Sequence, residues 1–129
     1  MKNILEPPIG IILTVPKRFF EETGYTYAAF EKDFMNVMDR EDGIWNFLKK
    51  QLPTRDFLYV YLVFDGFVQL RCNLLDMQRN ESKRFGDNGK IRSFAKKNWI
   101  RLCGPAEKAP IDIPMKGFQG FRYVTKELW

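Results

Sequence analysis

Alternating apolar and polar positions predict several β-strands along this chain. In residues 9–15 the odd-numbered apolar side chains share one face of an extended segment. Residues 57–64 form an unbroken apolar and aromatic run, which is typical of a strand covered on both faces. Asp65-Gly66 then predicts a hairpin turn into a returning strand over residues 67–77. The alternation of that strand slips by one residue at Leu74-Leu75, which indicates a β-bulge.

A helical period of apolar residues replaces this alternation in the first half of the chain. Apolar side chains spaced by three and four residues predict a helix from Tyr27 to Met38, with Thr26 as a candidate N-cap. A shorter helical turn is predicted over residues 19–23, where Gly24 stops it.

A second amphipathic helix is predicted from about Gly43. Its apolar stripe consists of Ile44, Phe47, Leu48 and Leu52, with Asp42 as a candidate cap and Pro53 as its end. Trp45 lies on the shoulder of this stripe, and both a packing role and a ligand contact remain open for it.

Strand patterns return in the last third of the chain. Residues 99–103 alternate, with Ile100 and Leu102 on one face and Trp99 and Arg101 on the other, and Gly104-Pro105 is expected to break the strand. A short edge strand is predicted over residues 111–114. A glycine-hinged segment, residues 116–123, leads into the last strand, and a terminal turn from Thr125 follows.

Basic residues are concentrated between these patterns, in residues 79–97. This segment holds seven Lys and Arg against two acidic residues, so it carries the whole net charge of +5. Gly86-Asp87-Asn88-Gly89 at its middle predicts a turn or flexible tip within a variable polar loop. Such a concentration suits a polyanionic partner, and the alternative is a solvated loop kept soluble by its charge.

These elements predict one α+β domain over residues 1–129: a small, strongly bent antiparallel sheet or β-barrel with flanking N-terminal helices. Hydrophobic residues make up 45% of the 129 residues, enough for a real core. Aromatic residues reach 16%, including twelve Phe. Barrel cores and cross-strand pairs account for most such residues.

Several kinds of chemistry are excluded by composition. The chain has no histidine, so it has no Ser–His or Cys–His catalytic pair and no His-ligated zinc. Cys72 and Cys103 cannot complete a structural zinc site alone, and the sequence contains no glycine-rich phosphate loop or calcium loop. We therefore expect no cofactor and no metal. Two cysteines in strand-like runs indicate free, buried thiols in a reducing compartment.

A membrane location is not expected either. No apolar stretch is long enough to span a bilayer, and residues 1–10 lack the hydrophobic region of a signal peptide. The cytoplasm is the predicted location.

The order of predicted elements resembles the PUA-like superfamily, especially its EVE and ASCH branches. The likeness is carried by Trp45 before the central hairpin, by residues 56–76 as that hairpin, by Trp99-Ile100-Arg101-Leu102 and by the closing residues 121–128. It implies a small β-barrel, flanked by helices, that binds nucleic acid through an aromatic pocket. Pro16-Lys17-Arg18 stands where the ASCH pattern has Gly-Lys-Thr, so no catalytic residue is carried over.

The leading functional hypothesis is a non-catalytic module that binds RNA or DNA. Basic side chains neutralise phosphates, and exposed aromatic side chains stack on bases. Trp99 and Arg101 are expected on one strand face, with Lys96 and Lys97 just before them. The candidate nucleic-acid-binding residues are Arg71, Lys83, Arg84, Lys90, Arg92, Lys96, Lys97, Trp99, Arg101, Arg122 and Tyr123.

Two other functions stay open. A protein-interaction or inhibitory module would use the same aromatic and arginine side chains against an acidic protein surface. An enzyme is the less favoured alternative, for example a small hydrolase of ASCH type. The cluster of Lys17, Glu21 and Glu22 after the first strand is its candidate site. A pocket lined by Trp99 and opening onto the basic segment would favour nucleic acid, whereas a flat aromatic patch would favour a protein partner.

Overall fold

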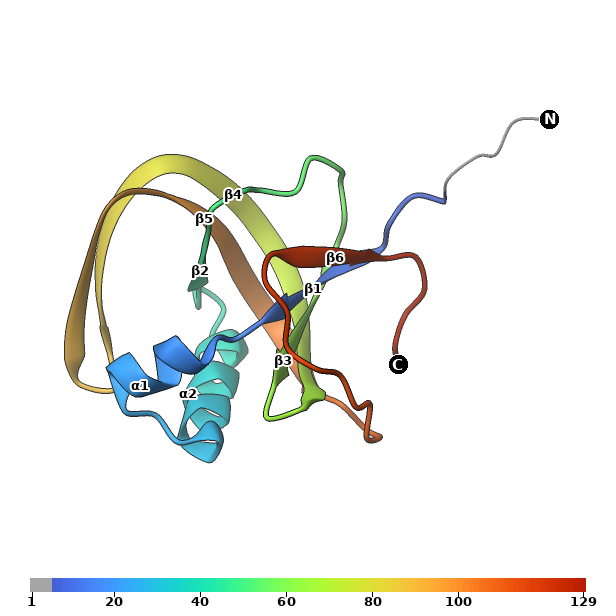
Figure 1. The fold of residues 1–129 in the computed structure, drawn as a ribbon, viewed down its shortest axis with the longest axis horizontal. Coiled ribbons are helices and arrows are strands. Elements are labelled where there is room, and N and C mark those ends of the chain that lie inside the picture. Colours follow the sequence, from blue (N-terminus) through green and yellow to red (C-terminus); the bar gives the residue numbers. More distant parts are fainter. Residues whose placement is uncertain (1–5) are drawn as a thin grey trace.

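A computed structural model describes residues 6–129 and consists of two helices and one curled sheet of six strands (Figure 1). The elements in chain order are β1 (Gly10–Thr14), α1 (Lys17–Thr23), α2 (Tyr27–Asp39), β2 (Trp45–Lys49), β3 (Tyr59–Phe64), β4 (Phe67–Asp87), β5 (Lys90–Lys108) and β6 (Phe121–Val124). This is a small α+β fold of the barrel-like kind, as the sequence predicted.

The sheet has the order β2-β5-β4-β3-β1-β6 and is not wholly antiparallel. The predicted hairpin of β3 and β4 is confirmed, with its register shift and its turn at Asp65-Gly66. β1, however, pairs with β3 in parallel, which corrects the expectation of an antiparallel sheet. The long crossover through both helices and β2 permits this, since parallel neighbours need such a connection.

The sheet curls into a half-barrel whose edge strands, β2 and β6, approach each other. Side chains bridge the gap: Lys49 Nζ donates to the Gly120 carbonyl at 3.0 Å, and Tyr123 Oη accepts from the backbone N–H of Thr54 at 3.0 Å. Burial lowers the pKa of Lys49. The open side of the sheet is therefore closed by polar contacts rather than by a strand ladder.

Both N-terminal helices form as predicted. Gly24 ends α1 with φ 74°, and the Thr26 side chain accepts a hydrogen bond from the backbone N–H of Ala29 at the start of α2. Phe30 and Phe34 of α2 are fully buried against the sheet. The helical period of the sequence thus marks the face that covers the core.

The second predicted helix is wrong, because residues 45–49 form strand β2. Trp45 and Phe47 contact the core, while Leu48 stays 41% exposed, so the segment alternates as a strand does. Gly43 passes so close to the Val37 carbonyl that no Cβ would fit there. This tight passage turns the chain from α2 straight into the sheet, where β2 pairs with β5.

The basic segment is not the loop that its composition predicted. It belongs to β4 and β5, which form one long ribbon of paired strands. The turn at Asn88-Gly89 is confirmed, with φ of 53° and 75° as a two-residue hairpin turn requires. β5 also continues through Gly104-Pro105, so the predicted break there is wrong.

The C-terminal predictions are confirmed in part. β6 forms as expected and pairs with β1. The strand predicted at residues 111–114 is reduced to a single bridge between Phe67 and Pro114. No helical turn is found in residues 125–129.

Two apolar clusters lie on the two faces of the sheet. The larger one joins α2 to the concave side through residues such as Phe30, Leu62 and Ile100, and the smaller one centres on Tyr61. Cys72 belongs to the larger cluster, is 1% exposed and has a raised pKa through burial, so its predicted burial is confirmed. Cys103 is also a free thiol, but it is partly exposed, so the expectation that both thiols are buried is wrong for Cys103.

Candidate functional site

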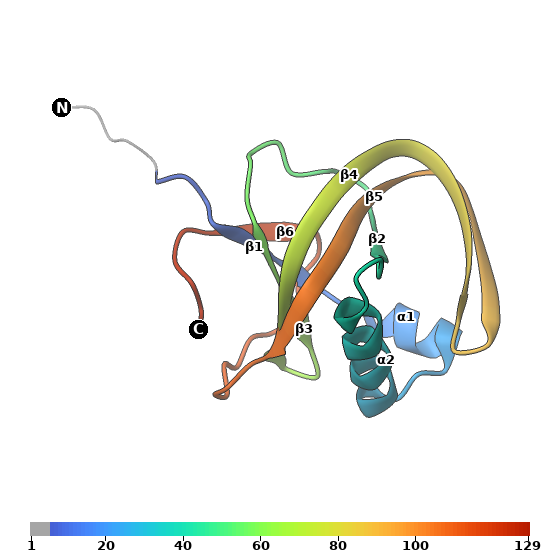
Figure 2. The ribbon, with the colours of Figure 1, turned by 180° about the vertical axis from the view of Figure 1, so that it is seen from behind.

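The candidate site lies under a segment that we call the arm, residues 79–98 of the β4–β5 ribbon. No residue of the arm is buried. At its base Asn80 (φ 55°) and Lys96 (φ 26°) both have positive φ, and the pairing register shifts between Gln78 and Lys83. Such bulges bend a strand. The arm therefore arches away from the sheet and returns to the helices (Figures 1 and 2).

Polar contacts hold the tip of the arm against the helices. Asn88 Nδ2 donates to the Thr23 carbonyl at 2.8 Å, and the backbone N–H of Asn88 donates to Tyr25 Oη at 3.2 Å. Tyr25 Oη in turn donates to Asp33 at 2.9 Å. Burial, together with this bond to Asp33, raises the pKa of Tyr25 to about 12. We call these contacts the tip latch.

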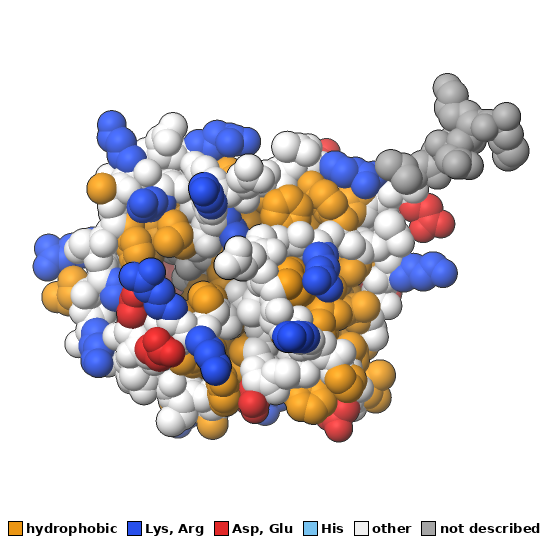
Figure 3. All heavy atoms as spheres, in the orientation of Figure 1, with side chains coloured by type: hydrophobic (Ala, Val, Ile, Leu, Met, Phe, Trp, Pro, Cys, Tyr) orange, Lys and Arg blue, Asp and Glu red, His pale blue; other side chains and the backbone are white. Residues whose placement is uncertain are grey.

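A cavity of about 520 Å³ lies between the arm, α1 and β2, and we call it the pocket. Its volume falls within the range of small-molecule sites. Figure 3 shows the hollow, with hydrophobic side chains in its walls and charged side chains around it. The aromatic side chains that line it are Phe19, Phe30, Trp45, Phe47, Phe85, Phe94 and Trp99.

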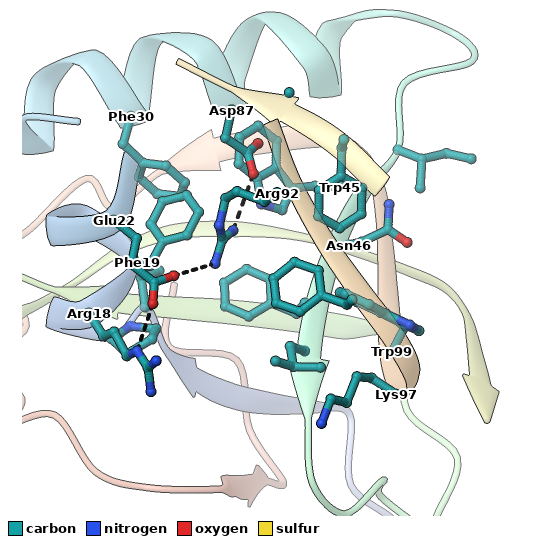
Figure 4. Close-up of a pocket in the computed structure, with 18 of the residues that line it drawn as sticks. Arg18, Phe19, Glu22, Phe30, Trp45, Asn46, Asp87, Arg92, Lys97 and Trp99 are labelled. Atoms are coloured by element: carbon teal, nitrogen blue, oxygen red, sulfur yellow. Dashed lines mark hydrogen bonds and ion pairs between the residues drawn. The ribbon is translucent and has the colours of Figure 1, made fainter. Parts of the chain in front are cut away.

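Charged side chains gather at one side of the pocket (Figure 4). Arg92 reaches Asp87 and Glu22 at 3.2 Å each, and Glu22 also accepts from Arg18 Nε at 2.6 Å. Hydrogen bonds from Arg18 and Arg92 hold the pKa of Glu22 below its ordinary value. Lys97 lies across the pocket from Arg18 in this view.

Trp99 is inside the molecule, which corrects the expectation of an exposed stacking face. Its side chain is 1% exposed and contacts Phe85 and Phe94 edge to face, with ring centroids 5.5 and 5.3 Å away. Its Nε1 donates to the Glu81 carbonyl at 2.8 Å. The bent arm covers the indole, so Trp99 forms a wall of the pocket rather than an open platform.

The predicted basic residues divide into free and paired ones. Within the described chain, six of them make no ion pair: Arg122 on β6 and, on the arm, Lys83, Arg84, Lys90, Lys96 and Lys97. Lys83 Nζ lies 5.9 Å from the Trp99 ring centroid. Arg92 is the one predicted basic residue of the arm that forms ion pairs, with Glu22 and Asp87, and these pairs hold it in the pocket lining.

The remaining predicted residues lie on the body of the sheet and do not line the pocket. Arg71 pairs with Glu107 at 2.7 Å and lies over the Tyr59 ring, and Arg101 forms a bidentate pair with Asp76 at 2.6 Å. Arg122 lies over the Phe118 ring, and Tyr123 bridges the sheet edges. These four residues have intramolecular partners and are not brought together with the arm.

Sequence reasoning missed part of the pocket. Arg18 and Phe19 are absent from the predicted binding residues, and Glu22 enters only the enzyme hypothesis. Lys17 and Glu21, the other members of that cluster, are exposed on α1. Adjacent basic and aromatic residues before Glu22 are too common in a helix to mark a site. Only the return of the arm onto α1 brings them to the pocket.

The described residues also bear on metals and membranes. Within residues 6–129, no group of three or more His, Cys, Asp or Glu side chains is placed to hold a metal ion. No helix in that range is both long and apolar enough to cross a membrane.

Comparison with known proteins adds no relative. Neither a family model, nor a curated protein, nor a solved structure matches the chain.

Proposed function

We propose that this protein is a non-catalytic nucleic-acid-binding module that holds a single strand of RNA or DNA along the arm. One observation supports the proposal: the arm carries both the free cations and part of an aromatic pocket, and one of those cations, Lys97, lines the pocket together with Trp99. A basic groove beside aromatic walls is the usual arrangement for single strands, whose bases are free to leave the stack.

The two parts of the site have different tasks in this proposal. Arg84, Lys90, Lys96 and Lys97 are exposed and contact phosphates, which fixes the strand without reading its sequence. The pocket receives one unstacked base between its aromatic walls. The assignment to the PUA-like superfamily and the cytoplasmic location belong to the same proposal.

Salt-dependent binding tests the phosphate contacts. The double variant Lys96→Gln/Lys97→Gln should bind single-stranded RNA and DNA of every sequence more weakly. Its plot of log affinity against log salt should flatten by about 0.7 for each phosphate that the variant no longer neutralises. The matched control is Lys116→Gln/Lys126→Gln, which removes the same charge from exposed positions outside the arm. It should keep the wild-type slope.

The outcomes separate the partner from the site. If both double variants flatten the slope equally, the partner is right but the arm is not its site. If the wild type binds no RNA, DNA or duplex at low salt, the nucleic-acid proposal fails. An acidic protein surface is then the alternative partner for the exposed cations.

A further inference from the structure

Two guanidinium groups converge on one carboxylate at the side of the pocket. Arg18 Nε donates to Glu22 Oε1 at 2.6 Å and Arg92 Nη2 donates to Glu22 Oε2 at 3.2 Å, so each carboxylate oxygen has its own arginine (Figure 4). This arrangement presents two convergent donors at the edge of an aromatic cavity. Charge-assisted bonds of this kind are the strong contacts by which proteins hold carboxylate and phosphate groups.

Arg92 keeps its place without Glu22. Its guanidinium lies over the rings of Phe19 and Phe94, with distances of 5.2 and 5.0 Å to their centroids, and it bonds to Asp87 through Nη1. Its side chain is only 19% exposed. Arg92 is therefore a pre-positioned donor whose Nη2 faces the position that Glu22 occupies.

Glu22 and Arg18 are held much less firmly. Their side chains are 39% and 85% exposed, and they lie one helical turn apart on α1. Exposed ion pairs at this spacing contribute little to stability. A stronger anion can therefore displace the carboxylate without disturbing the core.

We propose that Arg18 and Arg92 form a phosphate site that the Glu22 carboxylate occupies in the free protein, so that the pocket takes a nucleotide whose phosphate displaces Glu22. This inference rests on the proposed function, which it sharpens by naming where the phosphate next to the bound base lies. A phosphate monoester, as in a free nucleotide or at a strand end, carries more negative charge than a carboxylate and has three acceptor oxygens. A phosphodiester within a strand carries one negative charge and keeps two free oxygens, one for each arginine.

The charged side chains around the pocket favour the binding of an additional anion. Arg18, Arg92 and Lys97 face Glu22 and Asp87 around the pocket, which leaves one positive charge in excess. Glu22 thus acts as an internal competitor, which lowers the affinity for weakly charged ligands. Removal of its charge should strengthen the binding of a phosphorylated ligand and leave that of an uncharged nucleoside unchanged.

The experiment measures binding of the four ribonucleoside 5′-monophosphates and of the matching nucleosides, followed through NMR shifts. Glu22→Gln should bind the monophosphates about tenfold more tightly than wild type. The reason is that the charged Glu22 carboxylate, which competes with the phosphate for the two arginines, is replaced by a neutral amide. Glu21→Gln is the matched control. It removes the same charge from an exposed neighbour on α1 and should stay within about twofold of wild type. Arg18→Gln should weaken monophosphate binding severalfold.

The possible results distinguish the phosphate site from the proposed function. Equal affinities of Glu22→Gln and Glu21→Gln for a monophosphate would overturn the inference, as would an equal gain for the nucleoside. If single-stranded RNA or DNA binds to the arm but no monophosphate binds, the phosphate site fails and the proposed function stands. If neither binds, both fail. A retained thermal unfolding midpoint for the variants, which change only exposed side chains, excludes misfolding as the cause.

Discussion

The body of the sheet and the arm are built from the same two strands, yet they are stabilised differently. In the body, β4 and β5 place Leu70, Cys72, Ile100 and Leu102 in the core with at most 1% exposure. Beyond the bend the same strands contain no buried residue from 79 to 98. The arm has no core of its own: it is held by its backbone ladder, by the tip latch, by the ion pair of Arg92 with Glu22 and by the contacts of Phe85 and Phe94 with Trp99.

This difference bears on how the arm can move over the pocket. Segments with few buried apolar contacts unfold locally at low free energy, and binding elements are drawn from them. The inner side of the arm carries Phe85, Arg92 and Phe94, which would have no apolar partner in a solvated loop. In the structure the Phe85 and Phe94 side chains lie over the pocket and are not part of the core. We therefore expect the arm to open locally while the body remains folded.

The largest expected effect is the loss of stability when a phenylalanine is removed from the core rather than from the arm. Phe30→Ala should lower the free energy of unfolding by about 3–5 kcal/mol, because Phe30 is fully buried among Phe19, Phe34, Trp45 and other rings. Phe94→Ala, the same change in the arm, should cost about 1 kcal/mol. Denaturant unfolding measures both. Equal losses would mean that the arm is part of the core.

The sequence predicted the body well because its elements have unambiguous periods. The run at residues 57–64 and the turn at Asp65-Gly66 define one hairpin without help from the rest of the chain. α2 has three helical turns and a capping threonine. The prediction for β2 was wrong because five residues are too few to distinguish the helical period of 3.6 from the strand period of 2. Phe47 and Leu48 fit the apolar stripe of a helix, while Trp45 and Phe47 fit the alternation of a strand.

The candidate site could be predicted only in part. The basic segment and Trp99 can be identified from the sequence, and they do meet at the pocket. The arm has the sequence of a loop because its inward positions mix Lys83, Phe85 and Asp87, which gives no apolar alternation. Contacts between the arm and α1 join residues about 65–70 apart in sequence, as Arg92 and Glu22 do. No local sequence pattern predicts a contact between residues so far apart in the chain.

The next effect is the pH dependence of the tip latch. Tyr25 has its folded pKa raised to about 12, so its contribution to stability is fully present below its ordinary pKa of 10.0 and is lost as pH rises through 12. Wild type should therefore lose more stability between pH 10 and 12 than Tyr25→Phe does. Absorbance titration of the phenols should contain one late group that disappears in this variant. A normal titration of all tyrosines would contradict the latch geometry.

A smaller effect is expected in hydrogen exchange, which should distinguish local unfolding of the arm from unfolding of the body. Asn88→Gly removes the side-chain bond to the Thr23 carbonyl and keeps a residue that tolerates the positive φ of 53°. Backbone amides of the arm should then exchange hydrogen about fivefold faster, since one hydrogen bond contributes roughly 1 kcal/mol. Amides of β3 should keep their wild-type rates. Faster exchange in both regions would mean that they unfold as one unit.

The smallest expected effect concerns the bend at the base of the arm. A side chain at positive φ is strained, whereas glycine is not, although glycine costs about 0.5–1 kcal/mol elsewhere in a strand. Lys96 has φ 26°, and its neighbour Lys97 is an exposed strand lysine without positive φ. Lys97→Gly should therefore destabilise the protein by about 1 kcal/mol, while Lys96→Gly should leave the free energy of unfolding nearly unchanged because strain relief offsets the entropic cost.

The two glycine variants remove the same side chain one position apart, so their difference isolates the backbone conformation. Denaturant unfolding should place Lys96→Gly about 1 kcal/mol above Lys97→Gly. A β-branched residue at the bend, as in Lys96→Val, should fall below both, since it tolerates positive φ least. If all three variants have the same stability, the bend is not strained, and the arm reaches α1 because the tip latch pulls it there rather than because its base directs it.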